Sequence, residues 1–267
     1  MRFLTWLMLC SFIGAKSVTS ILAVVLWILG FPFLAEIMEI NAYDYTWFYY
    51  GTLVLGALAV VFIAPKVLRI ASKISPERQR HMAFSYVLIN RNLETVDTFK
   101  VLTSTAFMQR IGLRQMWGIT SREDVLEIAQ SLSQAGSHTP FADEIYHKII
   151  KSSLKHEEYD EQKKILIEKG YTERELSQIK TLAAWDYGRT AYVLRFSAHA
   201  GYIKQKEAWT YMKAAADNAA REYDSWRQFF AAYHLGRAIA FGEVTEFDTT
   251  LNPSIFDKRP FSKIDFK

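Results

Sequence analysis

The chain has a single cysteine, Cys10, among its 267 residues. One cysteine cannot build a disulfide framework, and it excludes a zinc site made from several cysteines. With only six prolines and twelve glycines, the sequence is neither low-complexity nor collagen-like. Its length is typical of one large globular domain or two small ones.

The usual sequence signatures of catalysis and cofactor binding are also missing. There is no G-x-S-x-G motif, no P-loop, no G-x-G-x-x-G fingerprint and no H-E-x-x-H zinc motif. No two of the six histidines have the i, i+4 spacing of a helical metal site. We therefore expect no metal and no cofactor, and the sequence does not name a reaction.

Long hydrophobic runs, in contrast, are present near the N-terminus. Residues 18–35 and 47–64 each carry no charge. A membrane-spanning helix needs about 17–25 apolar residues, because the hydrocarbon core is about 30 Å thick. We therefore predict a transmembrane helical hairpin within residues 1–72. The alternative, a pair of buried core helices, is disfavoured because two adjacent uncharged runs are rare in soluble domains.

Three interpretations of residues 1–15 stay open. Arg2 followed by an apolar run to Ala15 resembles a cleaved signal peptide, although its positive region is minimal. We favour an interfacial or a partly inserted segment, in which the Lys16 side chain reaches the lipid headgroups.

The distribution of charge predicts the orientation of the hairpin. The loop at residues 36–46 holds three acidic residues and no lysine or arginine. Arg2 and Lys16 precede the first run, and five basic residues follow the second by residue 80. Positive residues stay on the cytoplasmic side of a membrane. Both termini are therefore predicted to be cytoplasmic, with a short acidic loop outside.

Charge also indicates which partners to expect. Residues 1–80 contain seven Lys and Arg and four Asp and Glu, whereas residues 81–267 contain 25 and 24. The basic excess next to the predicted spans favours contact with anionic lipid. A nucleic-acid-binding domain usually has a strongly basic face, so we expect no nucleic acid as a partner.

After residue 72 the pattern is helical, so the predicted fold class is all-α. We predict a connecting helical region at residues 73–104, a helical domain at 105–242 and an extended tail at 243–267. Ser75-Pro76-Glu77 and the capping box at Thr120 or Ser121 are helix start signals.

Three further helices are predicted in the second half of the domain. The first begins at Thr172 and runs to about Ala200, where Gly201 ends it. The second covers residues 204–223 and carries a stripe of alanines. The third begins at Asp224 or Ser225 and ends before Gly242. In the tail, we expect phenylalanine side chains to dock on the domain: Phe256, Phe261 and Phe266.

One group of residues could carry chemistry. Helical spacing places Trp185, Asp186 and Arg189 on the apolar face of the first helix. Tyr233 and Arg237 share a face of the last helix in the same way. Each arginine follows a glycine, and a glycine inside a helix costs about 1 kcal/mol relative to alanine. A closely packed backbone or aromatic ring should offset that cost.

Two interpretations of this group are open. Asp186 could be shared by Arg189 and Arg237 in a structural ion network that locks two helices together. Alternatively, the two guanidinium groups could bind a carboxylate or phosphate, because one aspartate cannot neutralise both. We favour the structural interpretation, and we keep Trp185 and Tyr233 as further candidate ligand-binding residues.

A series of motifs in the same region resembles a bacterial family with a C-terminal helical domain of unknown function. The motifs span about residues 105–242 and follow one another in the family's order: Trp117-Gly118-Ile119, Thr120-Ser121, Leu126, Trp185-Asp186-Tyr187-Gly188-Arg189, Gly201-Tyr202-Ile203, Glu207-Ala208-Trp209, Ser225-Trp226, Tyr233 and Gly236-Arg237. The resemblance implies an all-α domain and a bacterial source. It supplies no activity and no catalytic residue.

These observations lead to one main hypothesis and two rivals. The main hypothesis is an inner-membrane accessory protein whose cytoplasmic helical domain binds another protein, for example as an immunity protein against a toxin. The first rival is an enzyme or small-anion sensor that uses Asp186, Arg189 and Arg237. The second is a transport subunit, which is disfavoured because the predicted spans contain no acid or base.

Overall fold

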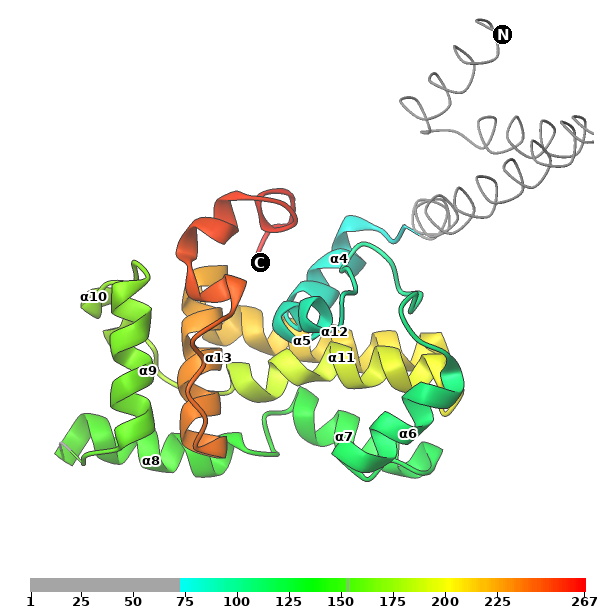
Figure 1. Cartoon of the computed structure of the whole chain (residues 1–267), viewed down its shortest axis with the longest axis horizontal. Coiled ribbons are helices and arrows are strands. Elements are labelled where there is room, and N and C mark those ends of the chain that lie inside the picture. Colours follow the sequence, from blue (N-terminus) through cyan, green and yellow to red (C-terminus); the bar gives the residue numbers. More distant parts are fainter. Residues whose placement is uncertain (1–72, 153) are drawn as a thin grey trace, which may run out of the picture. The chain divides into compact units, whose positions relative to one another are not determined.

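The computed structural model describes residues 73–152 and 154–267, which form one compact unit (Figure 1). This part of the chain contains helices and no β-strand, apart from one isolated bridge between Lys73 and Thr98. The all-α prediction is therefore confirmed for these residues. The predicted membrane hairpin and the interpretations of residues 1–15 lie outside the described residues. None of the described helices is both long enough and apolar enough to cross a bilayer.

Ten α-helices and three short 3₁₀ helices make up the described part of the chain. Their bounds in chain order are α4 (Pro76–Ala83), α5 (Tyr86–Arg91), α6 (Ala106–Trp117), α7 (Arg122–Ser133), α8 (Thr139–Ser152), α9 (Glu157–Glu168), α10 (Glu173–Ser177), α11 (Ala184–His199), α12 (Gln205–Glu222), α13 (Trp226–Phe241), η1 (Thr249–Leu251), η2 (Pro253–Asp257) and η3 (Phe261–Lys263).

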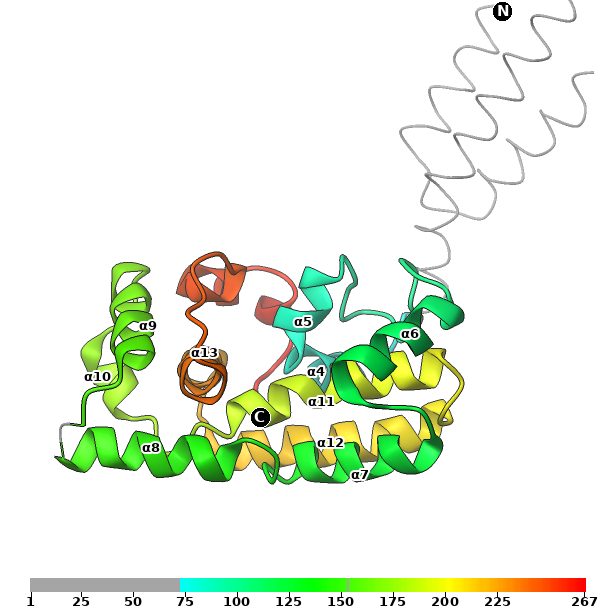
Figure 2. The same ribbon diagram turned by 60° about the horizontal axis from the view of Figure 1, so that its bottom comes forward.

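Helix α11 forms the centre of this unit. Every residue from Ala184 to Ser197 is buried. The helix contacts α4, α5, α6, α7, α12 and α13, and Figure 2 shows α12 and α7 beneath it and α4 and α5 above it. A helix that is covered on all sides has no solvent-facing stripe. Charged residues in α11 therefore need partners from the surrounding segments.

Helices α11 and α12 form an antiparallel hairpin (Figures 1 and 2). The turn between them contains Gly201 at φ 85°, in the left-handed region that glycine tolerates best. The predicted alanine stripe of α12 is buried, with Ala208, Ala215, Ala216 and Ala219 at 3% exposure or less. The burial of the stripe is thus confirmed, and such small side chains favour a close approach of the neighbouring helices.

Gly188 and Gly236 lie where helices α11 and α13 cross. A methyl group on Gly188 would lie 2.6 Å from two ring carbons of Tyr233. A methyl group on Gly236 would lie 3.0 Å from the Leu182 carbonyl oxygen and from Trp185 Cβ. The expected explanation for both glycines, a backbone or aromatic ring packed against them, is confirmed.

Replacing Gly188 with alanine should therefore destabilise the protein, although alanine is the better helix former. The cost of overpacking is about 1–3 kcal/mol. Gly112→Ala in α6 is the matched control, because the added methyl group would meet only Met116 Cε at 3.6 Å. That control should gain up to about 1 kcal/mol. Urea unfolding of both variants measures the difference, and equal midpoints would contradict the packing role of Gly188.

The prediction of one helix from Thr172 to Ala200 is wrong. Thr172 does cap a helix, and Glu175 completes the capping box, but this helix is the short α10. The chain then turns before α11 begins at Ala184. Asp143 accepts hydrogen bonds from the Leu182 N–H and the Thr181 hydroxyl, and the Tyr223 hydroxyl accepts one from the Ala184 N–H. These groups from other helices stabilise the break, which no local glycine or proline marks.

The tail is not extended, as the sequence suggested, but folds into the three 3₁₀ helices η1, η2 and η3. Its docking on the domain is nevertheless confirmed. Phe261 and Phe266 are buried, and each lies within 5.2 Å of Trp226 between ring centroids. Phe256 stacks on Phe230 at 5.6 Å. The segments that the sequence analysis separated at residues 104 and 242 thus lie in the same compact unit.

Candidate functional site

Asp186 acts as the N-terminal cap of a different helix. Its carboxylate accepts hydrogen bonds from the backbone N–H groups of Ser137, His138 and Thr139 at 3.0–3.1 Å, and from the Thr139 hydroxyl at 2.8 Å. These donors lie at the start of α8, where unpaired N–H groups and the helix dipole favour a negative charge. The Asp186 side chain is fully buried. It therefore holds α8 against α11.

Arg189 completes this buried cluster. Its guanidinium group pairs with Asp186, and its Nε donates to the Trp185 carbonyl oxygen at 3.2 Å. Its charge also lies over the rings of Trp185 and Trp117, at 4.7 and 5.6 Å from their centroids. Because burial disfavours the charged form, the pKa of Arg189 is lowered, and the Asp186 carboxylate opposes that shift. The two residues are thus paired as the sequence predicted.

Arg237 does not share Asp186, so that part of the structural prediction is wrong. Its guanidinium group pairs with Glu243 and donates to the Thr245 hydroxyl at 2.6 Å. Glu243 follows α13 directly, after Gly242 reverses the chain at φ 62°. A local turn therefore supplies the second carboxylate that the sequence analysis did not anticipate.

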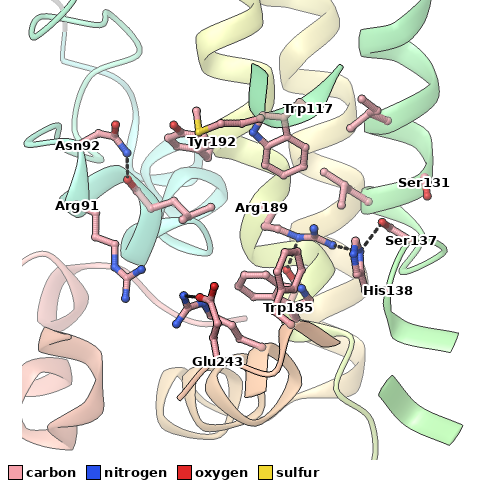
Figure 3. A pocket seen from close by; sticks show the side chains of 16 residues that line it. Arg91, Asn92, Trp117, Ser131, Ser137, His138, Trp185, Arg189, Tyr192 and Glu243 are labelled. Atoms are coloured by element: carbon pink, nitrogen blue, oxygen red, sulfur yellow. Dashed lines mark hydrogen bonds and ion pairs between the residues drawn. The ribbon is translucent and has the colours of Figure 1, made fainter. Parts of the chain in front are cut away.

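Arg189 and Arg237 nevertheless line the same pocket, which has a volume of about 760 Å³ (Figure 3). The pocket lies between α5, α6, α7, α11 and α13. Four aromatic residues form much of its wall: Trp117, Trp185, Tyr192 and Phe241. A third arginine, Arg91, also lines it and lies 3.5 Å from Asp248. Three arginines are therefore matched by three carboxylates, so the site has no net formal charge.

His138 lies at the pocket and is held in one tautomer. Its Nδ1 is 2.9 Å from Arg189 Nη2 and 2.8 Å from the Ser137 hydroxyl (Figure 3). Because a guanidinium group only donates, Nδ1 accepts and the proton of the neutral ring is on Nε2. Burial and the neighbouring Arg189 both lower the pKa of His138, which favours this neutral form. The ring therefore offers an N–H donor at Nε2, not a general base.

Trp185 and Tyr233 have mainly packing roles. Their rings meet edge to face at 4.9 Å, and Trp185 meets Phe241 in the same way at 5.4 Å. Tyr233 is 1% exposed and does not line the pocket. Burial raises the pKa of the Tyr233 hydroxyl, so it stays protonated. Of the five candidate ligand-binding residues, only Trp185, Arg189 and Arg237 line the pocket.

The sequence analysis missed another fully buried charge, Arg195. Its guanidinium group donates to Glu94 at 2.8 Å and to the carbonyl oxygens of Phe99, Thr95 and Lys100. Glu94 in turn accepts from Leu102 and Thr103. This arrangement fixes the segment between α5 and α6, which has almost no regular secondary structure.

His199 and His234 have separate hydrogen-bond partners. His199 bonds to the Ser104 carbonyl oxygen, whereas His234 bonds to the Thr250 hydroxyl. Among residues 73–152 and 154–267, no group of three or more His, Cys, Asp or Glu side chains could hold a metal ion.

His234 predicts a pH dependence of stability. Burial lowers its pKa from an ordinary value of 6.5 to about 4, with Asp248, Arg91 and Arg237 as charged neighbours. Between pH 6.5 and 4, His234 therefore binds a proton in the unfolded chain but not in the folded chain. Stability should fall by about 3 kcal/mol as the pH drops through this range.

His234→Gln should remove this contribution to the pH dependence of stability, whereas the exposed His147→Gln should keep it. Urea midpoints at pH 5 and 7 measure both, and equal pH slopes would contradict the assignment.

Comparison with known proteins identifies a family for this chain. Residues 112–252, more than half of the chain, match the family described as "Protein of unknown function (DUF1266)". The chain is also similar to the uncharacterized protein YbeR of Escherichia coli K12, with 26% identity over 143 residues. That match covers 52% of this chain and spans 59% of the relative's length. No solved structure matches.

Proposed function

Because the chain belongs to the DUF1266 family, whose function is unknown, we propose its role from its own surface and N-terminal sequence. We propose that it is a membrane-anchored bacterial accessory protein whose helical domain binds another protein. The apolar outer face of α6 is the observation that carries this proposal.

Helix α6 buries only Leu113. Phe107, Met108 and Ile111 are 69%, 58% and 38% exposed. Helical spacing places these three side chains within one turn of each other on the outer face. Contiguous exposed apolar surface of this kind, bordered by polar residues, is typical of interaction sites. We name these three residues the α6 face.

The charges beside the α6 face define the partner. Arg110 and Arg114 are exposed on the same helix, and α6 contains no acidic residue. A protein surface with an apolar centre and neighbouring carboxylates would complement it. The uncharged runs at residues 18–35 and 47–64 support a membrane anchor that keeps this domain at the cytoplasmic side of the inner membrane. One concrete form of the partner is a toxin against which the chain confers immunity.

The alternative function, an enzyme or small-anion sensor at Asp186, Arg189 and Arg237, has less support. Both guanidinium groups are paired with a carboxylate, and only Arg237 has a partner, Glu243, that is exposed enough to be exchanged for a ligand. Asp186 is also engaged by the N-terminus of α8. The Ser137 hydroxyl lies 2.8 Å from His138 Nδ1, but that nitrogen also accepts from Arg189, and burial lowers the pKa of His138, so the ring is a poor base for the hydroxyl.

Photo-crosslinking in living cells tests the proposed interaction. Benzoylphenylalanine at position 107 of the full chain should give one discrete protein adduct. The same probe at Lys164 is the control, because α9 lies at the opposite end of this unit from α6 (Figures 1 and 2) and Lys164 is exposed. Ile111→Asp should abolish the adduct at position 107 by placing a charge in the apolar face.

Two outcomes would contradict the proposal. One is the absence of a discrete protein adduct at position 107, for example because the probe reacts only with lipid. The other is an adduct that Ile111→Asp leaves unchanged while circular dichroism shows a folded domain.

A further inference from the structure

The pocket between α5, α6, α7, α11 and α13 has features of a small-molecule site that are independent of the α6 face. Its volume of about 760 Å³ lies within the range of ligand pockets, about 300–1,000 Å³. Trp117, Trp185, Tyr192 and Phe241 supply ring surfaces on several sides. Such walls suit an apolar body about the size of one or two fused rings.

The charges of the pocket differ in how firmly they are held. The Asp186 and Asp248 side chains are 0% and 4% exposed and are fixed in the interior. Glu243 is 58% exposed, and it is the acidic partner of Arg237 at the pocket. When Glu243 turns into solvent, the site keeps one unmatched guanidinium group. One ligand carboxylate would neutralise it through the planar geometry that arginine favours.

His138 adds a second hydrogen-bond donor to the lining of the pocket. Its Nδ1 is occupied by Arg189 and Ser137, so its Nε2–H is the free position of the ring. The ring is stacked on Phe241 at 5.1 Å, which holds its plane beside the aromatic wall. Because Arg189 and Arg91 are paired with buried carboxylates, only the Arg237 guanidinium group can be left unmatched, and one such group suits a carboxylate better than a multiply charged phosphate.

We infer that this pocket binds a monocarboxylate with an apolar, ring-sized body. Arg237 binds the carboxylate, and the aromatic wall binds the body. Glu243 occupies Arg237 in the empty pocket and competes with the ligand.

Fluorine NMR of the full chain in detergent tests this inference with 2-naphthoate as the probe. The chain is labelled with 5-fluorotryptophan, and its seven tryptophans are distinguished by Trp117→Phe and Trp185→Phe spectra. Addition of 2-naphthoate should shift the Trp117 and Trp185 signals with a submillimolar Kd. Methyl 2-naphthoate, which has the same rings without the charge, should bind at least tenfold more weakly.

Three variants make the test specific to this pocket. Glu243→Gln should tighten 2-naphthoate binding about tenfold, because it removes the competing carboxylate. Ser131→Trp on α7 should fill the pocket and weaken binding more than tenfold. Glu127→Trp, on the exposed side of the same helix, is the matched control and should bind as the unmodified chain does. The same detergent is present throughout, so partition of 2-naphthoate into micelles affects all variants equally, and the Kd of the more apolar methyl ester is calculated from its measured free concentration.

The inference fails if 2-naphthoate up to several millimolar leaves both signals unchanged. It also fails if Ser131→Trp binds as tightly as Glu127→Trp, or if the methyl ester binds as well as the acid. Circular dichroism identifies a Ser131→Trp protein that does not fold. In that case an unchanged Kd for the conservative Glu243→Gln variant overturns the inference.

Discussion

Replacing Asp186 with alanine should destabilise the helical domain by about 3–5 kcal/mol, because the change leaves Arg189 buried without its counter-charge. The Arg189 side chain is 5% exposed, so water can solvate little of its charge. The three backbone N–H groups at the start of α8 also lose their acceptor. Urea unfolding followed by circular dichroism measures the loss.

The exposed ion pair between Glu144 and Lys148 provides a matched control. Its side chains are 65% and 54% exposed, so Glu144→Ala should change stability by less than about 1 kcal/mol. A double change, Asp186→Ala with Arg189→Met, should be more stable than Asp186→Ala alone, because no unpaired charge stays buried. If Asp186→Ala keeps full stability, the structural role of the pair is refuted.

A loss of similar or larger size is expected for Arg195→Met. The guanidinium group is fully buried, and methionine would fill its volume without donating to any of its four acceptors. An unpaired Glu94 charge alone costs about 3–5 kcal/mol, and each carbonyl oxygen left without a donor adds about 1–3 kcal/mol. Lysine should not rescue the fold, because it lacks the planar fork that reaches several acceptors.

Hydrogen exchange locates this effect. In Arg195→Met, the amides of Leu102 and Thr103 should lose protection first, because both donate to Glu94. Arg174→Met on the exposed side of α10 should leave stability within about 0.5 kcal/mol. If these two amides stay protected from exchange in Arg195→Met, other contacts hold the segment.

Helix α11 shows how far the sequence could predict the fold. Helical spacing predicted that this helix exists and that it buries Asp186 and Arg189. The cost of glycine in a helix predicted the close packing at Gly188. Arg195 could not be recognised from spacing, because helical periodicity indicates burial only where a helix has one apolar and one solvent-facing side. Since α11 is covered on every side, no polar stripe marks the positions that need partners.

The site was predicted only where its contacts are local. Asp186 and Arg189 are three residues apart on one helix, and their pairing follows from that spacing. The capping of α8 by Asp186 joins residues that are 47–49 apart in the sequence. His138 and Asn92 reach the pocket from loops, and Glu243 does so from the turn after α13. No periodic pattern brings such segments together, so the pocket could not be predicted.

The charged candidate residues thus have two different roles, one structural and one at the pocket. Asp186 and Arg189 have a structural role, as predicted, but they join α11 to α8 and not to the last helix through Arg237. Arg237 is paired less firmly, because its partner Glu243 is largely exposed. It is therefore the one candidate arginine whose guanidinium group a ligand can engage without opening the core.

The proposed function depends most directly on where the chain lies in the cell. Green fluorescent protein fused after Lys267 can be followed through ultracentrifugation of a detergent-free bacterial lysate. An anchored chain with a cytoplasmic C-terminus should be fluorescent and should sediment with the membranes. Fluorescence that stays in the supernatant with the intact chain, or a sedimenting fusion that is not fluorescent, would contradict the membrane-anchored account.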